Sequence, residues 1–263
     1  MLASVGQWFK NRPVVKLFDI IHEDADLLAI NKPAGLVCHP TKGDVYSSLI
    51  SRVRLHLGEG APAHLVNRLD RETSGVILVA KSPEADAALK KLFALRRVEK
   101  EYLGIAHGHF ASEAVTCEAP LGKDEQAIIA IKDCVRPDGA VSKTEFAVAQ
   151  RFTRPEGNFT LLRIRPHSGR KHQIRIHLQH LGHPLVGDKL YGGDERLYLD
   201  FVLRQLTVEQ RARLILPCQA LHAAVLRFHW RDRDWEFRAE PEAWFAAFVA
   251  GQPCTPDWAE KYL

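Results

Sequence analysis

A short apolar run at residues 76–80, Val-Ile-Leu-Val-Ala, directly follows a cluster of charged residues. Continuous β-branched runs of this length are typical of strands buried on both faces. A helix is predicted next, because Ser82 can cap its start, Pro83 suits its first position and residues 96 and 97 place arginines in its last turn. Its buried face is expected to consist of Leu89, Leu92 and Phe93.

Other short apolar segments bounded by turn residues predict further strands. Two open the pattern, at residues 14–21 and 27–30, and an acidic turn separates them. Later strands are predicted at residues 101–107, 159–165 and 219–230, the last as one strand or a strand pair. A short helix is expected to begin near Lys171, and its buried face is formed by Ile174, Leu178 and Leu181.

Strands and helices mix without the regular alternation of a parallel β/α protein, which indicates an α+β fold with a largely antiparallel sheet. We expect residues 1–13 to form an N-terminal arm and residues 14–263 to form one domain. Segments 122–142 and 192–215 are interpreted as insertions on that domain. A packed strand and helix near the end of the chain are predicted from Phe237, Trp244, Phe245 and Phe248.

Composition narrows the class of protein further. The 263 residues are 46% hydrophobic and 26% charged, with a formal net charge of +4, which permits a phosphate-bearing or nucleic-acid partner without requiring one. No apolar stretch approaches the ~20 residues of a membrane span, and the N-terminus does not read as a signal peptide. The 5 cysteines are dispersed, which favours reduced thiols and a cytoplasmic location.

The charged cluster before the 76–80 strand places Arg68 and Arg71 around Asp70. Neighbouring cations would lower the pKa of this carboxyl group and keep it ionised at neutral pH. An ionised carboxylate at the head of a rigid strand can act as a nucleophile or base. The alternative is a salt-bridged turn that only starts the strand, with Thr73 or Ser74 as a local cap.

A second charged segment, residues 163–184, is basic over its first half. Its cations, with no acidic residue among them, are Arg163, Arg165, Arg170, Lys171 and Arg175. The turn at residues 168–170 leads into the predicted helix, and a helix N-terminus beside arginines is suited to binding phosphate. A solvated basic face is the plainer alternative.

The same segment contains histidines at positions 172, 177, 180 and 183. Zinc usually takes several His, Cys or carboxylate ligands, but only arginines and lysine surround these histidines, so we expect no metal site and instead packing or hydrogen bonds to backbone. Phosphate-binding loops of the GxGxxG and Walker types are missing from the sequence, which argues against a nucleotide cofactor. Tyr102 lies on a predicted strand, and nothing in the neighbouring sequence indicates a functional role for it.

Several segments together resemble the RluA-type pseudouridine synthases, in the order in which that family carries its motifs. They are NKPAG at 31–35, NRLDRETSG at 67–75, KEY at 100–102, SGRKHQIR at 168–175, GHPLVGD at 182–188 and LHA at 221–223. The resemblance implies a pseudouridine synthase fold with a mixed, largely antiparallel sheet, flanking helices and a central RNA-binding cleft. It also implies isomerisation of uridine to pseudouridine in RNA without a cofactor.

By this resemblance, Asp70 is the catalytic group, Arg170 is its ion-pair partner and Tyr102 stacks on the target base. Arg68 enters the RNA helix where the base has left, and Leu221 lines the base pocket. Flipping a base costs a few kcal/mol, which stacking and phosphate contacts would offset. Our own assignments for substrate contacts complete the set: Arg71, Thr73, Lys171 and Arg175.

Two departures from the family pattern bear on these expectations. Asn67 stands where the family usually has histidine, a position that looks peripheral. Only about a dozen residues precede the predicted domain, too few for the S4-type RNA-binding domain that many relatives carry. We therefore expect a monomer that selects its RNA, tRNA and/or large-subunit rRNA, through the catalytic domain alone.

Two other functions stay open. The chain could be a non-catalytic RNA-binding module that retains the fold, in which case it forms no pseudouridine. It could also be a glycosidase-like hydrolase of a nucleoside or sugar phosphate, with Glu72 as the second carboxylate beside Asp70. Release of free uracil would favour the hydrolase.

Overall fold

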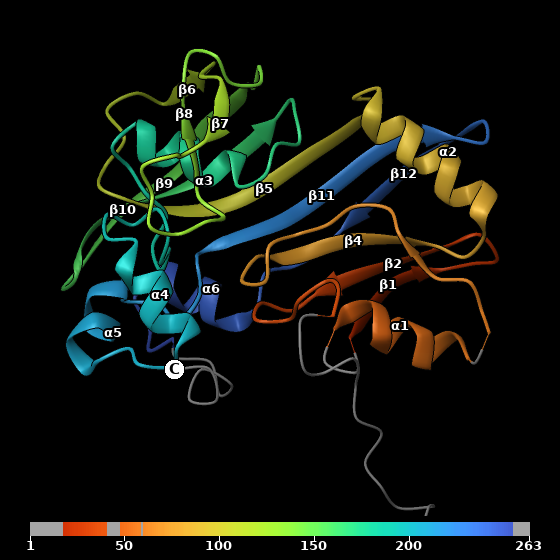
Figure 1. Cartoon of the computed structure of the whole chain (residues 1–263), viewed down its shortest axis with the longest axis horizontal. Helices are drawn as coiled ribbons and strands as arrows, with labels where there is room; N and C mark the ends of the chain where they lie inside the picture. Colours follow the sequence, from red (N-terminus) through yellow and green to blue (C-terminus); the bar gives the residue numbers. More distant parts are fainter. Residues whose placement is uncertain (1–17, 41–47, 59, 255–263) are drawn as a thin grey trace, which may run out of the picture.

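The computed structural model describes residues 18–40, 48–58 and 60–254. The predicted arm at residues 1–13 lies outside this range, as does the start of the predicted 14–21 strand, and the division into arm and domain stays a prediction. Within the described residues, a 10-stranded sheet runs through the molecule in the order β1-β2-β4-β11-β5-β10-β9-β6, with β12 beside β11 and β3 beside β4 (Figure 1). Its strands are β1 (Asp19–Glu23), β2 (Leu27–Lys32), β3 (His64–Leu65), β4 (Ser74–Ala80), β5 (Val98–His107), β6 (Ala114–Cys117), β9 (Thr144–Arg154), β10 (Gly157–Pro166), β11 (Leu221–Trp230) and β12 (Arg233–Arg238).

The sheet is largely antiparallel, as the mixed pattern predicted. The parallel pair is β4 with β11, where Gly75 lies opposite Ala223. A Cβ atom on Gly75 would come within 2.2 Å of the Ala223 carbonyl oxygen, and its φ of +112° is a conformation that other residues rarely adopt. Glycine at this position therefore permits the close approach of the two central strands.

Helices cover both faces of the sheet (Figure 1). They are α1 (Leu49–Leu57), α2 (Pro83–Ala94), α3 (Gln173–His180), α4 (Arg196–Val202), α5 (Val208–Leu214) and α6 (Ala243–Val249). Alternation along β4 explains the layers: Val76 and Leu78 pack with α2, while Ile77 and Val79 pack with α1. Further along the sheet, α3 and α6 cover opposite faces in the same way.

The start of the predicted α2 is confirmed, with Ser82 as the N-cap that accepts a hydrogen bond from the Ala85 amide and Pro83 in the first turn. Its predicted end is wrong: the helix stops at Ala94, and Arg96, with a φ of 56°, and Arg97 lie beyond the last turn, whose cation is Lys91. Strand β4 is buried at every position, as its continuous apolar run indicated. Helix α3 begins at Gln173, slightly after the predicted start. The packed C-terminal strand and helix correspond to β12 and α6, whose Phe237, Trp244, Phe245 and Phe248 are buried.

Other elements were not predicted. Strands β6 and β9 and helix α1 fall in segments for which the pattern gave no expectation. The 122–142 segment includes most of a hairpin of β7 (Leu121–Lys123) with β8 (Asp133–Val135), and the 192–215 segment includes α4 and α5. In the described part of the chain, no helix has the length and apolar character needed to cross a membrane.

Residues of β5 with even numbers, from Val98 to Ala106, face α2 and α3, while Leu103 and Ile105 face α6. Lys100 and Tyr102 lie between the ends of the two helices on that face. The loop that joins β10 to α3 and the loop that precedes β4 also line the space between α2 and α3. This arrangement forms the cleft described next.

Candidate active site

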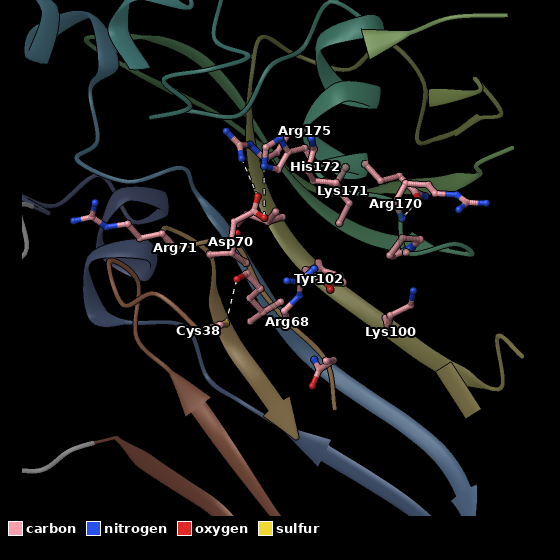
Figure 2. Close-up of a pocket in the computed structure, with 18 of the residues that line it drawn as sticks. Cys38, Arg68, Asp70, Arg71, Lys100, Tyr102, Arg170, Lys171, His172 and Arg175 are labelled. Atoms are coloured by element: carbon pink, nitrogen blue, oxygen red, sulfur yellow. Dashed lines mark hydrogen bonds and ion pairs between the residues drawn. The ribbon is translucent and has the colours of Figure 1, made fainter. Parts of the chain in front are cut away.

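A cavity of about 600 Å³ lies between α2, α3 and the centre of the sheet. Asp70, Tyr102 and Arg170 all line it, from three segments far apart in the sequence (Figure 2). Of the other predicted site residues, Arg68, Arg71, Thr73, Lys171, Arg175 and Leu221 line it as well. The predicted set is therefore brought together, although the individual contacts differ from those expected.

Asp70 comes from the loop before β4, and 31% of its side chain is exposed to the cavity. Its Oδ2 atom accepts a 2.8 Å hydrogen bond from Nη1 of Arg175 and a longer one, 3.5 Å, from Nε2 of Gln219. Burial raises the pKa of this carboxyl group, but the charge of Arg175, a smaller effect of His172 and the hydrogen bonds from Arg175 and Gln219 outweigh burial, so the pKa lies below its usual value. Asp70 is thus an ionised, accessible carboxylate.

Arg175 occupies the role that we had expected for Arg170, and the prediction for Arg170 is wrong in this structure. The guanidinium of Arg170 extends away from Asp70 (Figure 2). The physical reason is the position of helix α3: Arg170 lies in the exposed turn before it, whereas Arg175 lies on its buried side. We had also expected Arg68 and Arg71 to lower the pKa of Asp70. This expectation is wrong, because the main cation that lowers it is Arg175.

Arg175 was also expected to contact phosphate, and this too is corrected. Its side chain is only 7% exposed, and two further donors are held by Asp188: Nε donates to Oδ2 at 2.7 Å and Nη2 donates to Oδ1 at 2.8 Å. Asp188 also accepts bonds from the backbone amides of Leu190 and Tyr191. The carboxylate–guanidinium–carboxylate chain is a fixed support for Asp70.

Thr73 is buried beneath the cavity floor. Its hydroxyl accepts a 2.7 Å hydrogen bond from Nε2 of Gln219, the amide group that also reaches Asp70, and its backbone amide donates to the Asp70 carbonyl. Thr73 therefore orients Asp70 and Gln219. Arg71 points away from the carboxylate (Figure 2). Its Nε donates to the Gly35 carbonyl and its guanidinium lies 5.3 Å from the ring centroid of Phe201, so it tethers the loop.

Lys32 supports the same loop from below. It is fully buried, and its ammonium group donates hydrogen bonds to the carbonyls of Pro33, Leu36 and Arg71, at 2.8, 2.9 and 3.1 Å. Burial lowers the pKa of this lysine to about 8. The segment 31–35, noted in the sequence only for its resemblance, thus fixes the backbone next to Asp70.

Tyr102 and Lys100 project from β5 into the cleft (Figure 2). Burial, with a smaller effect of Asp70, raises the pKa of Tyr102, so its hydroxyl stays protonated at neutral pH. Nζ of Lys100 donates to the Ser168 carbonyl at 2.8 Å, and burial together with Arg96 lowers the pKa of the lysine to about 8. Lys100 thus connects β5 to the 168–172 loop, a function that the sequence did not reveal.

Arg68 and Lys171 lie at the exposed edge of the cavity. Lys171 forms a 2.9 Å ion pair with Asp133, so part of its charge is already compensated. Leu221 is buried in the cavity wall, where an apolar surface for a planar ring is available. These positions are compatible with the substrate contacts that we expected.

Glu72 does not join Asp70 in the cavity. Its carboxylate accepts a 2.7 Å bond from Nζ of Lys189, within a buried ion pair beside the Gln219 amide. The paired-carboxylate arrangement needed for a glycosidase mechanism is therefore not formed by these two residues. Two of the histidines near α3 are hydrogen-bonded to the backbone: Nε2 of His177 contacts the Ala119 carbonyl and Nδ1 of His183 contacts the His107 carbonyl.

Comparison with known proteins identifies the arrangement. Residues 26–180 match the family model described as RNA pseudouridylate synthase. The dual-specificity RNA pseudouridine synthase RluA of Vibrio parahaemolyticus is 35% identical over 227 residues, covering 86% of this chain and 83% of that protein. Ribosomal large subunit pseudouridine synthase D of Haemophilus ducreyi is 35% identical, covering 86% of this chain and 67% of that protein.

Solved structures agree with the sequence comparison. Human RNA pseudouridylate synthase domain containing 1 superposes with a TM-score of 0.69 at 25% sequence identity, covering 88% of this chain and 86% of that chain. Human RNA pseudouridylate synthase domain containing 4 gives a TM-score of 0.68 at 25% identity. The predicted fold class is confirmed by these likenesses.

Proposed function

The chain belongs to the RNA pseudouridylate synthase family and is an RNA pseudouridine synthase, and we propose that Asp70 is its catalytic group. The observation that carries this proposal is the carboxylate itself, accessible in the cavity and kept ionised by a buried guanidinium at 2.8 Å. Such a group can attack C1′ of the target nucleotide or remove a proton from the sugar. Either step releases uracil from its N1 bond.

The remaining steps conserve every atom except one exchanged proton. The released uracil turns within the pocket and C5 bonds to C1′; as this bond forms, Asp70 leaves C1′ if it had attacked there, or the sugar regains the proton that Asp70 had removed. C5 then loses its proton and N1 gains one, so the product is an isomer of the substrate. We propose that Tyr102 is the surface on which the base stacks, with Leu221 on the cavity wall. Base–aromatic stacking is worth ~1–3 kcal/mol, comparable to the few kcal/mol that extrusion of a base costs.

RNA contacts are assigned to the exposed cations at the cavity edge. We propose that Arg68 occupies the space left by the extruded base, and that Arg170 and Lys171 contact phosphates. Support comes from their position: all three line the cavity and are exposed. Arg175 is not assigned to phosphate, because it is buried and bonded to Asp70 and Asp188.

The substrate is proposed to be structured RNA, tRNA and/or large-subunit rRNA. The support is the relatives' names, which describe one as dual-specific and another as acting on the ribosomal large subunit. Pseudouridine mapping of both RNA classes from cells with and without the gene is the test. A site lost in tRNA, rRNA or both identifies the substrate, and no lost site in either contradicts the assignment. We expect the protein to act as a cytoplasmic monomer, which light scattering of the purified protein and fractionation of cells would check.

Catalysis by Asp70 is tested with Asp70→Asn, which keeps the shape of the side chain and removes its charge. Tritium release from RNA labelled at C5 of uridine should fall to background, while RNA binding is retained. Asp234→Asn, at an exposed site on β12, is the matched control and should keep wild-type turnover. Wild-type release from Asp70→Asn would refute the assignment of Asp70.

The same assay separates the alternative functions. If the chain is a non-catalytic RNA-binding module, the wild-type protein itself would bind RNA and release no tritium. A hydrolase would release free uracil. No specific contact in the cavity favours either alternative over the isomerase.

A further inference from the structure

His172 borders the catalytic carboxylate in an unusual backbone conformation. Its φ of +55° lies in the left-handed region, which a few per cent of non-glycine residues adopt and which clusters at functional sites. The residue is the N-cap of α3, but its side chain makes no capping hydrogen bond. The ring is directed into the cavity wall instead, with 9% of the side chain exposed, beside Asp70 (Figure 2).

The two oxygens of Asp70 are not equivalent. The hydrogen bonds that Arg175 and Gln219 donate both end on Oδ2. Nε2 of His172 lies 3.9 Å from the other oxygen, Oδ1, which is beyond hydrogen-bonding distance but close enough for attraction to an N–H dipole. Among the described side chains, Oδ1 is thus left with its lone pairs uncommitted, while Oδ2 is anchored.

The tautomer of His172 follows from its other neighbour. The Tyr191 hydroxyl lies 3.0 Å from Nδ1 of His172 and accepts a 3.2 Å hydrogen bond from the Asp133 amide. With the amide on one acceptor site of the hydroxyl, the tautomer in which the hydroxyl donates its own proton to Nδ1 carries the imidazole proton on Nε2, the atom that faces Asp70.

His172 is also held neutral. Burial, then the charges of Arg175 and Lys171, lower its pKa to about 4, although the carboxylates of Asp70 and Asp188 oppose the shift. These groups, with Tyr191 and Asp133, are the charged and titratable neighbours that the structure places around the ring. A neutral imidazole can present one N–H without adding a charge that would compete with Arg175.

From this geometry we infer that Oδ1 of Asp70 is the atom that reacts with the substrate, and that His172 is a positioning residue whose Nε2–H, fixed by Tyr191, orients that oxygen. The inference rests on the proposed function of Asp70. It adds a chain of contacts that runs from the Asp133 amide through Tyr191 to His172. This chain orients Oδ1 of Asp70, as Arg175 orients Oδ2. No group is transferred to or from His172 in this role.

The tautomer can be tested without RNA. Nitrogen-15 NMR of the wild-type enzyme should show Nε2 of His172 as the protonated nitrogen and Nδ1 as the bare one, with a ring that stays neutral as the pH falls to about 5. In Tyr191→Phe the two tautomers should mix. Protonation of Nδ1, titration near the usual pKa of ~6.5, or an unchanged tautomer in Tyr191→Phe overturns the inference.

Kinetics then tests the role. Asn tolerates the left-handed conformation, so His172→Asn keeps the backbone while removing the N–H that faces Oδ1. Misplacement of a reacting atom can cost up to ~10²-fold, so kcat should fall by at least about tenfold with KM nearly unchanged. Loss of the N–H raises the pKa of Asp70, so the acid limb of the kcat profile should move to higher pH.

His172→Gln carries an amide nitrogen near the position of Nε2 and should recover part of kcat. The control is His229→Gln, an exposed histidine on β11 paired with Asp234, which should leave the profile unchanged. Equal kcat and an unshifted acid limb in folded His172→Asn would overturn the inference. If His172→Asn fails to fold, Tyr191→Phe decides by the same readouts. Absence of any tritium release by the wild-type enzyme would instead refute the proposed function, leaving the NMR result to stand alone.

Discussion

Arg175 on α3 reaches across the cleft to Asp70, 105 positions away in the sequence, and joins it through a 2.8 Å ion pair. The same guanidinium is held from behind by two bonds to Asp188. The carboxylate in the cavity is therefore tuned by a buried chain of alternating charges. Arg71, its neighbour in sequence, instead donates to the Gly35 carbonyl, and Arg68 lies at the exposed edge of the cavity.

Arg175→Ala should remove both activity and stability. The substitution leaves Asp188 buried without its partner and returns the pKa of Asp70 toward or above its usual value. Breaking a buried pair by removing one partner costs about 3–5 kcal/mol. Denaturant unfolding at neutral pH measures the change in stability. The rate of tritium release should fall to near background.

Arg170→Ala is the matched control for that experiment, because Arg170 is exposed and extends away from Asp70. Its free energy of unfolding should stay within about 0.5 kcal/mol of the wild type. Equal destabilisation by the two variants would contradict the assignment of Arg175, and not Arg170, as the ion-pair partner of Asp70.

The stability contributed by Asp188 should depend on pH in a defined window. Burial raises the pKa of this carboxyl, but Arg175 and two backbone amides lower it more, so its folded value lies below the ordinary 3.8. The unfolded chain therefore binds more protons in acid, and stability falls as the pH drops. The difference in unfolding free energy between wild type and Asp188→Asn should be constant from pH 8 to 5 and shrink below about pH 4.

Apolar patterning predicted the layers of this fold well, because burial on two faces leaves a direct record in the sequence. The run at 76–80 became the fully buried β4, and Ser82 and Pro83 began α2 where expected. The pattern did not predict β9, although its residues alternate in part. That strand is largely exposed at its far end, so few of its positions are constrained by burial.

The site was predicted at the level of segments and not of contacts. The motifs at 67–75, 100–102 and 168–175 meet in one cavity, as the resemblance implied. Arg175 is the cation of the third motif that turns inward. Two features decide this: α3 begins at Gln173, and the partner carboxylate Asp188 lies 13 positions after Arg175. Spacing alone cannot reveal such a pairing, which is decided by packing between distant elements.

Lys32→Met should destabilise the loop that holds Asp70. Methionine fills a similar volume but leaves the carbonyls of Pro33, Leu36 and Arg71 without the donor that they share. An unsatisfied buried polar group costs ~1–3 kcal/mol, partly offset here by relief from burying a charge, so we expect a net loss of about 2 kcal/mol. Turnover should fall more than RNA affinity. Lys81→Met, at a surface ion pair with Glu23, should change stability by less than about 1 kcal/mol.

Gly75→Ala should be among the most damaging single-atom additions. The new methyl group would meet the Ala223 backbone at 2.2 Å, and neither central strand can move without breaking its other pairings. A loss above about 4 kcal/mol, or failure to fold, is expected from such overlap. Gly169→Ala provides the comparison, since its methyl would lie 3.8 Å from the nearest atom, Nζ of Lys100, which is an ordinary van der Waals contact, and thermal unfolding should be nearly unchanged. Similar melting temperatures for the two variants would contradict the close-approach argument.

RNA affinity should depend on Arg170 through its charge. Arg170 lies on the border between the cavity and an adjoining groove of about 930 Å³, and both are lined by it. Arg165 lines the same groove and is similarly exposed, but its guanidinium is already paired with Glu101 at 2.9 Å. A cation that neutralises one phosphate contributes ~0.7–0.9 to the slope of log K against log salt concentration.

Arg170→Ala should therefore weaken binding and reduce that slope by nearly one unit, whereas Arg165→Ala should change it by less than half as much. Both measurements use the inactive Asp70→Asn background, so that binding is not confused with turnover, and a structured RNA shown to be modified by the wild-type enzyme. An unchanged slope in Arg170→Ala would mean that its guanidinium does not contact phosphate. An equal reduction in both variants would mean that RNA displaces Glu101 from Arg165. The RNA backbone would then contact the whole groove and not Arg170 alone.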